Sequence, residues 1–95
     1  MSDDPEIAVA LKYDREKDQA PRVVAKGLRL KAEKIKELAK QYEIPLMRNT
    51  TLAGALYRVD VGQEIPEELY DAVAEVLNFV YALQQERLDG ARARE

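Results

Sequence analysis

The feature that most constrains the fold is an apolar run that begins at the seventh residue. Residues 7–14 read IAVALKYD, and in a strand Val9 and Leu11 would lie on one face with Ala8 and Ala10 on the other. Apolar side chains on both faces are typical of a strand that is covered on both sides. Because only six residues precede it, its sheet partners must come from later in the chain or from another chain.

The segments that follow alternate between loop, strand and helix patterns. Residues 14–19 form a charged run that suits an exposed loop, and residues 20–27 (APRVVAKG) predict a second strand. Residues 44–48 (IPLMR) predict a third strand, whose proline places it at a strand start or on an edge. Between them, apolar side chains three or four residues apart predict a helix over 28–43 with a buried stripe of Leu28, Ala32, Ile35, Leu38, Ala39 and Tyr42.

Two further helices are predicted in the second half of the chain. Asn49, Thr50 and Thr51 offer capping oxygens for a short helix that ends near Gly62, and Pro66 opens a long last helix. The fold class is therefore α/β, a small mixed sheet of about three strands, completed by a fourth from elsewhere, surrounded by about three to four helices. We expect one domain over residues 7–85, with a disordered N-terminus over 1–6 and a charged, frayed tail over 86–95.

Composition excludes several classes of function. The 95 residues allow one domain, and 46% hydrophobic with 35% charged residues is typical of a folded protein. With neither Cys nor His, disulfides, thiol or serine–histidine chemistry and most zinc sites are excluded, and no cofactor is expected. A net charge of −3 gives no excess of basic residues for binding nucleic acid. No run approaches the roughly 20 apolar residues of a membrane span.

Clusters of charged residues have two interpretations each. The carboxylate pairs at residues 3–4 and 67–68 have the composition of a hydrolase acid and base, but a solvated terminus and a helix N-terminus explain them better. The lysines of the middle helix could bind an acidic partner. Because glutamates are interspersed among them, a solvated face is favoured.

Four segments in order carry a family resemblance. Residues 8–14 (AVALKYD), 20–27 (APRVVAKG), 52–57 (LAGALY) and 65–77 (IPEELYDAVAEVL) resemble the cytoplasmic C-terminal domain of the FlhB family. That family belongs to the export gate of flagellar and injectisome type III secretion systems. The resemblance covers about residues 7–83.

The resemblance implies that relatives cleave their own chain just ahead of this domain, and the present sequence departs from the motif that they use. Relatives carry transmembrane helices, then an Asn-Pro-Thr-His motif that cuts itself, and a strand upstream of the cut completes the sheet. Here Asp3, Asp4, Pro5 and Glu6 stand at that place, without the Asn and the His. We therefore expect no enzyme activity and interpret the chain as a stand-alone paralogue, the downstream half made as a separate protein.

The resemblance also implies a docking site for early export substrates. It falls on Ala20, Pro21, Ala74 and Leu77, whose small side chains would make a shallow site for a short peptide that binds weakly. Alternatively, Ala74 and Leu77 are simply inner-face residues of the last helix.

The expected function is that of a non-catalytic component of type III export, acting like the post-cleavage fragment of FlhB in substrate recognition or export specificity. Export apparatus proteins and export substrates are the implied partners. The implied location is cytoplasmic, with contact to the inner membrane through the export gate. The alternative is a structural partner that completes its sheet with an upstream FlhB fragment or another export-gate component.

Overall fold

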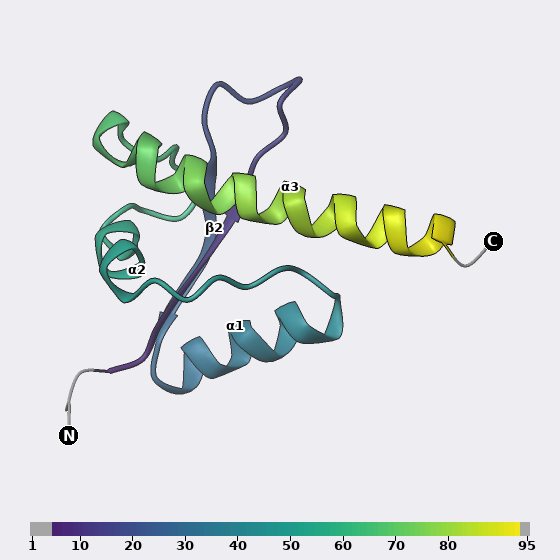
Figure 1. Ribbon diagram of the computed structural model, residues 1–95. Coiled ribbons are helices and arrows are strands. Elements are labelled where there is room, and N and C mark those ends of the chain that lie inside the picture. Colours follow the sequence, from purple (N-terminus) through teal and green to yellow (C-terminus); the bar gives the residue numbers. More distant parts are fainter. Residues whose placement is uncertain (1–4, 94–95) are drawn as a thin grey trace.

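A two-stranded sheet with helices on both faces forms the domain (Figure 1). The computed structural model describes residues 5–93, with side chains described as far as residue 86. In chain order the elements are β1 (Ile7–Lys12), β2 (Arg22–Leu28), α1 (Leu30–Gln41), α2 (Thr50–Tyr57), the short 3₁₀ helix η1 (Glu67–Leu69) and α3 (Tyr70–Ala93). The predicted α/β class and the first two strands are confirmed.

The sheet is antiparallel and narrower than predicted. β1 pairs with β2 from Ile7 opposite Leu28 to Lys12 opposite Arg22, and a bulge after Ala10 leaves Val24 unpaired and 43% exposed. The mixed sheet of about three strands is wrong, since the only sheet among the described residues contains these two strands.

The predicted third strand over residues 44–48 is wrong. The segment is irregular, and its first amide donates to the helix before it, from Ile44 N to Ala39 O at 2.7 Å. Pro45 has no amide hydrogen to offer a neighbouring strand. Ile44, Leu46 and Met47 are 57%, 53% and 43% exposed, so this apolar segment is left without cover in the described part of the chain.

A different segment extends the sheet at β2. Gly62 N donates to Val23 O at 2.7 Å, Val23 N donates to Gln63 O at 3.0 Å, and Ile65 N donates to Pro21 O at 2.9 Å. Residues 62–65 thereby run antiparallel to the start of β2, with a bridge at Arg22 and Glu64. This pairing holds Ile65 against the beginning of the strand.

α1 covers one face of the sheet through small side chains. Ala32 and Ala39 are its buried residues, and Ala8 of β1 is buried. The stripe predicted for this helix is wrong in part, because Leu28 belongs to β2, while Leu38 and Tyr42 are 40% and 65% exposed. A two-stranded sheet is too narrow to cover the whole stripe.

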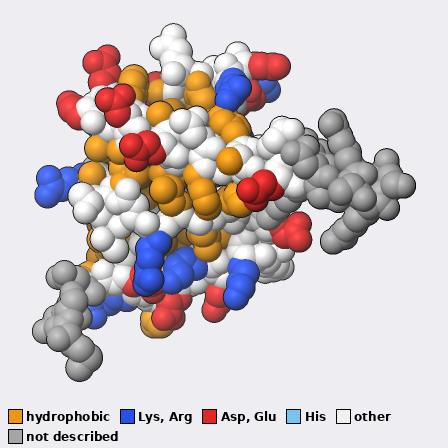
Figure 2. Space-filling model, in the orientation of Figure 1, with side chains coloured by type: hydrophobic (Ala, Val, Ile, Leu, Met, Phe, Trp, Pro, Cys, Tyr) orange, Lys and Arg blue, Asp and Glu red, His pale blue; other side chains and the backbone are white. Residues whose placement is uncertain are grey.

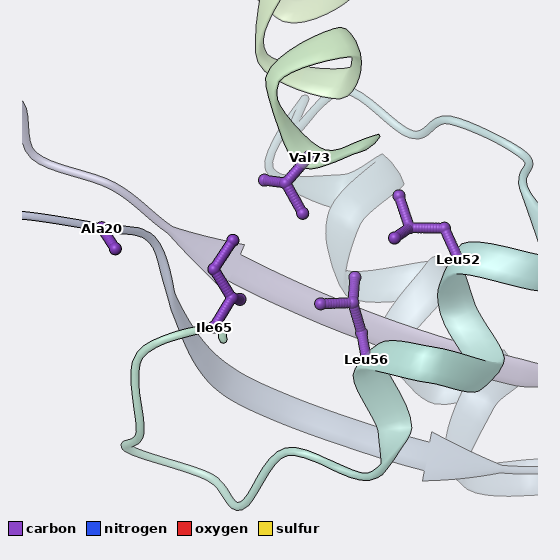
Figure 3. Close-up of a cluster of buried hydrophobic side chains, with 5 residues drawn as sticks. All are labelled: Ala20, Leu52, Leu56, Ile65 and Val73. Carbon is purple, nitrogen blue, oxygen red and sulfur yellow. The ribbon is translucent and has the colours of Figure 1, made fainter. Parts of the chain in front are cut away.

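The main core lies where α2 and α3 meet the other face of the sheet. Its buried members are Ala20, Leu52, Leu56, Ile65 and Val73, whose side chains converge in Figure 3. Val9 and Leu11 of β1 pack against this cluster, as their predicted shared face requires. α2 begins where predicted, because Asn49 Oδ1 accepts a hydrogen bond from Leu52 N at 3.0 Å.

The connection from β2 to α1 has an unusual backbone. Arg29 caps α1 with φ 55° and ψ −121°, a conformation in which a side chain clashes with its own backbone. Its amide donates to Glu6 O at 2.9 Å and its carbonyl accepts from Glu33 N at 3.0 Å. Two backbone hydrogen bonds therefore hold Arg29 in a strained position.

Candidate functional site

An apolar recess of about 160 Å³ opens between the segment that enters β2 and the first turns of α3. Tyr13, Gln19, Ala20 and Pro21 line one wall. The floor and the opposite wall are formed by Ile65, Tyr70, Val73, Ala74 and Leu77. Figure 2 shows hydrophobic side chains gathered across the middle of the face that α3 crosses, with acidic and basic side chains around them.

All four residues predicted as a docking site line this one recess. Ala20 and Pro21 are buried in its wall, Leu77 is half-buried, and Ala74 is exposed at the opening. Leu77 also packs against the core cluster, so it serves the fold as well as the recess. The first two residues lie 53 or more positions before the last two in the sequence, and the fold brings them together around one cavity.

The backbone pairing of residues 62–65 explains the shape of the floor. The hydrogen bond from Ile65 N to Pro21 O joins floor and wall directly, and Ile65 is 3% exposed. Across the recess, Tyr70, Ala74 and Leu77 follow one another at helical spacing along one face of α3. The small side chain of Ala74 leaves the opening between its two larger neighbours.

Sequence reasoning missed five lining residues: Tyr13, Gln19, Ile65, Tyr70 and Val73. Tyr70 could have been found, because it lies four residues before Ala74 on the predicted last helix. Ile65 could not, since its place depends on pairing with Pro21 that no local pattern indicates.

The chemistry of the recess is that of binding. Its lining is mostly aliphatic and aromatic, with tyrosines and one glutamine as the polar side chains, and this composition suits an apolar side chain of a short peptide. Within the described residues, no cluster of three or more acidic, His or Cys side chains could hold a metal ion. Glu67 and Glu68 lie in the first turn of η1, where carboxylates favour a helix start, whereas Asp3 and Asp4 lie outside the described residues.

No helix in the part of the chain that the structure describes combines the length and apolar character of a membrane span.

The sequence matches a known protein family over most of its length. The model of the FlhB HrpN YscU SpaS Family matches residues 4–80. Flagellar biosynthetic protein FlhB of Salmonella typhimurium is 48% identical over 86 residues, which are 90% of this chain and 22% of that protein. FlhB of Aquifex aeolicus is 55% identical over 75 residues, 78% of this chain and 21% of that protein. The chain thus spans about a fifth of the length of these relatives.

A shorter relative is matched over most of its own length. The uncharacterized protein YlqH of Bacillus subtilis is 42% identical over 78 residues, 82% of this chain and 84% of that protein.

Solved structures show the same fold. The cytoplasmic domain of FlhB from Shewanella putrefaciens superposes with a TM-score of 0.83 at 43% identity, covering 87% of this chain and 65% of that one. A mutated EscU/SpaS C-terminal domain gives a TM-score of 0.77 at 32% identity and covers 80% of this chain and 95% of that one. The chain belongs to the FlhB, HrpN, YscU and SpaS family and has the fold of its C-terminal cytoplasmic domain.

Proposed function

We propose that this domain is a non-catalytic component of type III protein export that captures short segments of export substrates in the apolar recess. In this role it acts like the post-cleavage C-terminal fragment of FlhB, in substrate recognition or export specificity. The supporting observation is that Ala20, Pro21, Ala74 and Leu77 line a single recess beside α3. The flagellar biosynthetic proteins among its relatives support the export pathway as the setting.

The recess favours weak capture. Burying one apolar side chain contributes about 1.5–3 kcal/mol, and a recess of about 160 Å³ admits one or two of them. The loss of translational and rotational freedom offsets most of this gain, so binding no tighter than about the millimolar range is expected. Fast release follows from such an affinity, which is what an export component that handles many substrates in turn requires.

The proposed setting is the cytoplasmic side of the export gate, with export apparatus proteins and export substrates as partners. Contact with the inner membrane would be indirect, through the gate.

A titration with a peptide from a flagellar rod or hook subunit tests the proposal. Ala74 is exposed, so Ala74→Asp should fold normally while placing a carboxylate at the opening, where an incoming apolar side chain would have to desolvate it. We expect at least a roughly tenfold loss of affinity. Ala82→Asp, an exposed position of α3 that does not line the recess, is the matched control and should bind like the unchanged protein. No binding of the unchanged protein at millimolar peptide, or equal binding by Ala74→Asp, would reject the proposal.

The exposed apolar segment at 44–48 favours a second candidate function. In this second function, the domain would complete its sheet with a strand donated by an upstream FlhB fragment or another export-gate component. β1 pairs with β2 along one of its edges, and no strand among the described residues pairs with the other edge of β1. Ile44, Leu46 and Met47 would supply apolar side chains for a donated strand to cover.

A pull-down with the upstream fragment of a full-length FlhB separates the two candidates. Leu46→Lys should weaken retention if the fragment covers this segment, whereas Val61→Lys, at a similarly exposed apolar position, should not. Ala74→Asp should leave retention unchanged, because its recess is a separate surface. If the Leu46→Lys variant retains the fragment as well as the unchanged protein does, strand donation at this segment is excluded.

A further inference from the structure

Arg15 and Tyr81 make a contact between the loop that leads into one wall of the recess and the helix that forms the opposite wall. Arg15 Nε donates a hydrogen bond to Tyr81 Oη at 2.9 Å, and the guanidinium carbon lies 4.1 Å from the centre of the tyrosine ring. Arg15 belongs to the loop between β1 and β2, which stands beside α3 in Figure 1, and Tyr81 belongs to α3. The two residues are 66 positions apart in the sequence, so the contact is tertiary.

Hydrogen bonds within the loop that carries Arg15 stabilise its conformation. Lys17 N and Asp18 N both donate to Asp14 O, at 3.1 and 2.7 Å, and Asp14 N donates back to Asp18 Oδ2 at 2.9 Å. Arg22 at the start of β2 forms an ion pair with Asp18 at 3.4 Å. Residues 14–18 therefore form a compact turn, and this turn leads directly into the wall residues Gln19, Ala20 and Pro21.

Tyr81 continues the face of α3 that lines the recess. Tyr70, Ala74, Leu77 and Tyr81 follow at intervals of four, three and four residues, so they lie along one stripe of the helix. The Arg15 contact therefore sits one helical turn beyond Leu77, at the end of the recess away from Tyr70.

We propose that Arg15 and Tyr81 form a clasp that holds the loop wall of the recess against α3 and so acts as a pair of positioning residues for peptide docking. This inference rests on the proposed docking function. Because Ala20 is buried in the core and Pro21 O accepts from Ile65 N, the clasp would position the turn at residues 14–18 and Gln19 after it, and peptide would bind more tightly when the clasp is closed. An exposed contact between a cation and an aromatic ring is weak. The clasp would therefore open and close readily, and the apparent affinity would depend on its closed fraction.

The test is the same rod or hook peptide titrated into four single variants. Arg15→Ala should weaken binding about three- to fivefold, through the lower closed fraction. Lys17→Ala removes the same charge from the same turn, where the described structure gives the side chain no hydrogen bond or ion pair, and should leave affinity unchanged. Arg15→Lys and Tyr81→Phe each retain part of the contact, the cation or the ring, and should give intermediate affinities at unaltered melting temperatures.

A double-mutant cycle and hydrogen exchange complete the test. If the two residues act as one clasp, adding Tyr81→Phe to Arg15→Ala should cause no further loss of affinity. Amides of residues 14–19 should exchange faster in Arg15→Ala than in Lys17→Ala, with no peptide present.

The outcomes separate the clasp from the docking function. Peptide binding by the unchanged protein with equal affinities for Arg15→Ala and Lys17→Ala would overturn the clasp and leave docking intact. Unchanged exchange at residues 14–19 would overturn the clasp independently of any peptide. No binding by the unchanged protein would overturn the docking function, and with it the role of the clasp in docking.

Discussion

Replacing Arg29 by glycine should stabilise the protein. At φ 55° and ψ −121°, a residue with a Cβ atom is strained by roughly 1–3 kcal/mol, and glycine is not. Glycine also makes the unfolded chain more flexible, which costs about 0.4–1 kcal/mol relative to alanine. The balance favours Arg29→Gly by about 1 kcal/mol, because the described structure gives the Arg29 side chain no hydrogen bond or ion pair to lose.

Arg29→Ala is the matched control, because it removes the same side chain but keeps the strain. It should change the free energy of unfolding by less than about 0.5 kcal/mol. Urea unfolding followed by circular dichroism gives both values. In a thermal melt, the glycine variant should gain about 4–8 °C for a domain of this size. The reasoning is refuted if Arg29→Gly is no more stable than Arg29→Ala.

Three further changes test the packing around the sheet and the recess. Ile65→Ala should lower the free energy of unfolding by about 2–4 kcal/mol, because Ile65 is 3% exposed. Val61→Ala, at a position that is 55% exposed, should lower it by less than about 0.5 kcal/mol. Urea unfolding of both variants measures the difference, and equal losses of stability would contradict the burial of Ile65. Gly27→Ala should cost about 1–3 kcal/mol in the same assay, because its Cβ would lie 2.6 Å from Lys31 Cγ, and an unchanged midpoint would mean that α1 shifts freely. Asn49→Ala should cost about 1 kcal/mol through the lost cap of α2, and a stability equal to the unchanged protein would show that the cap contributes nothing.

Local patterns predicted the elements better than their pairing. The strands β1 and β2 and the start of α2 were predicted because runs of apolar residues and a capping Asn are local signals. The third strand was wrong because a strand also needs a neighbour, and the amide of Ile44 instead closes the end of α1. Conversely, the pairing of residues 62–65 with β2 was missed, since it depends on tertiary contacts and not on a β-forming run.

The same distinction applies to the candidate site. Family resemblance supplied Ala20, Pro21, Ala74 and Leu77, and the fold brings all four to one recess. Composition alone would not have chosen them, because small and apolar residues are common in any core. The docking role of these residues remains a prediction.

Methyl NMR of the peptide complex tests the central claim most directly. With alanine and leucine methyl groups labelled, titration with the rod or hook peptide should move the signals of Ala20, Ala74 and Leu77, which line the recess. The signal of Leu46, on the exposed segment that a donated strand would cover, should stay in place. Shifts at Leu46 without shifts at Ala74 would contradict docking in the recess and favour the exposed segment as the binding surface.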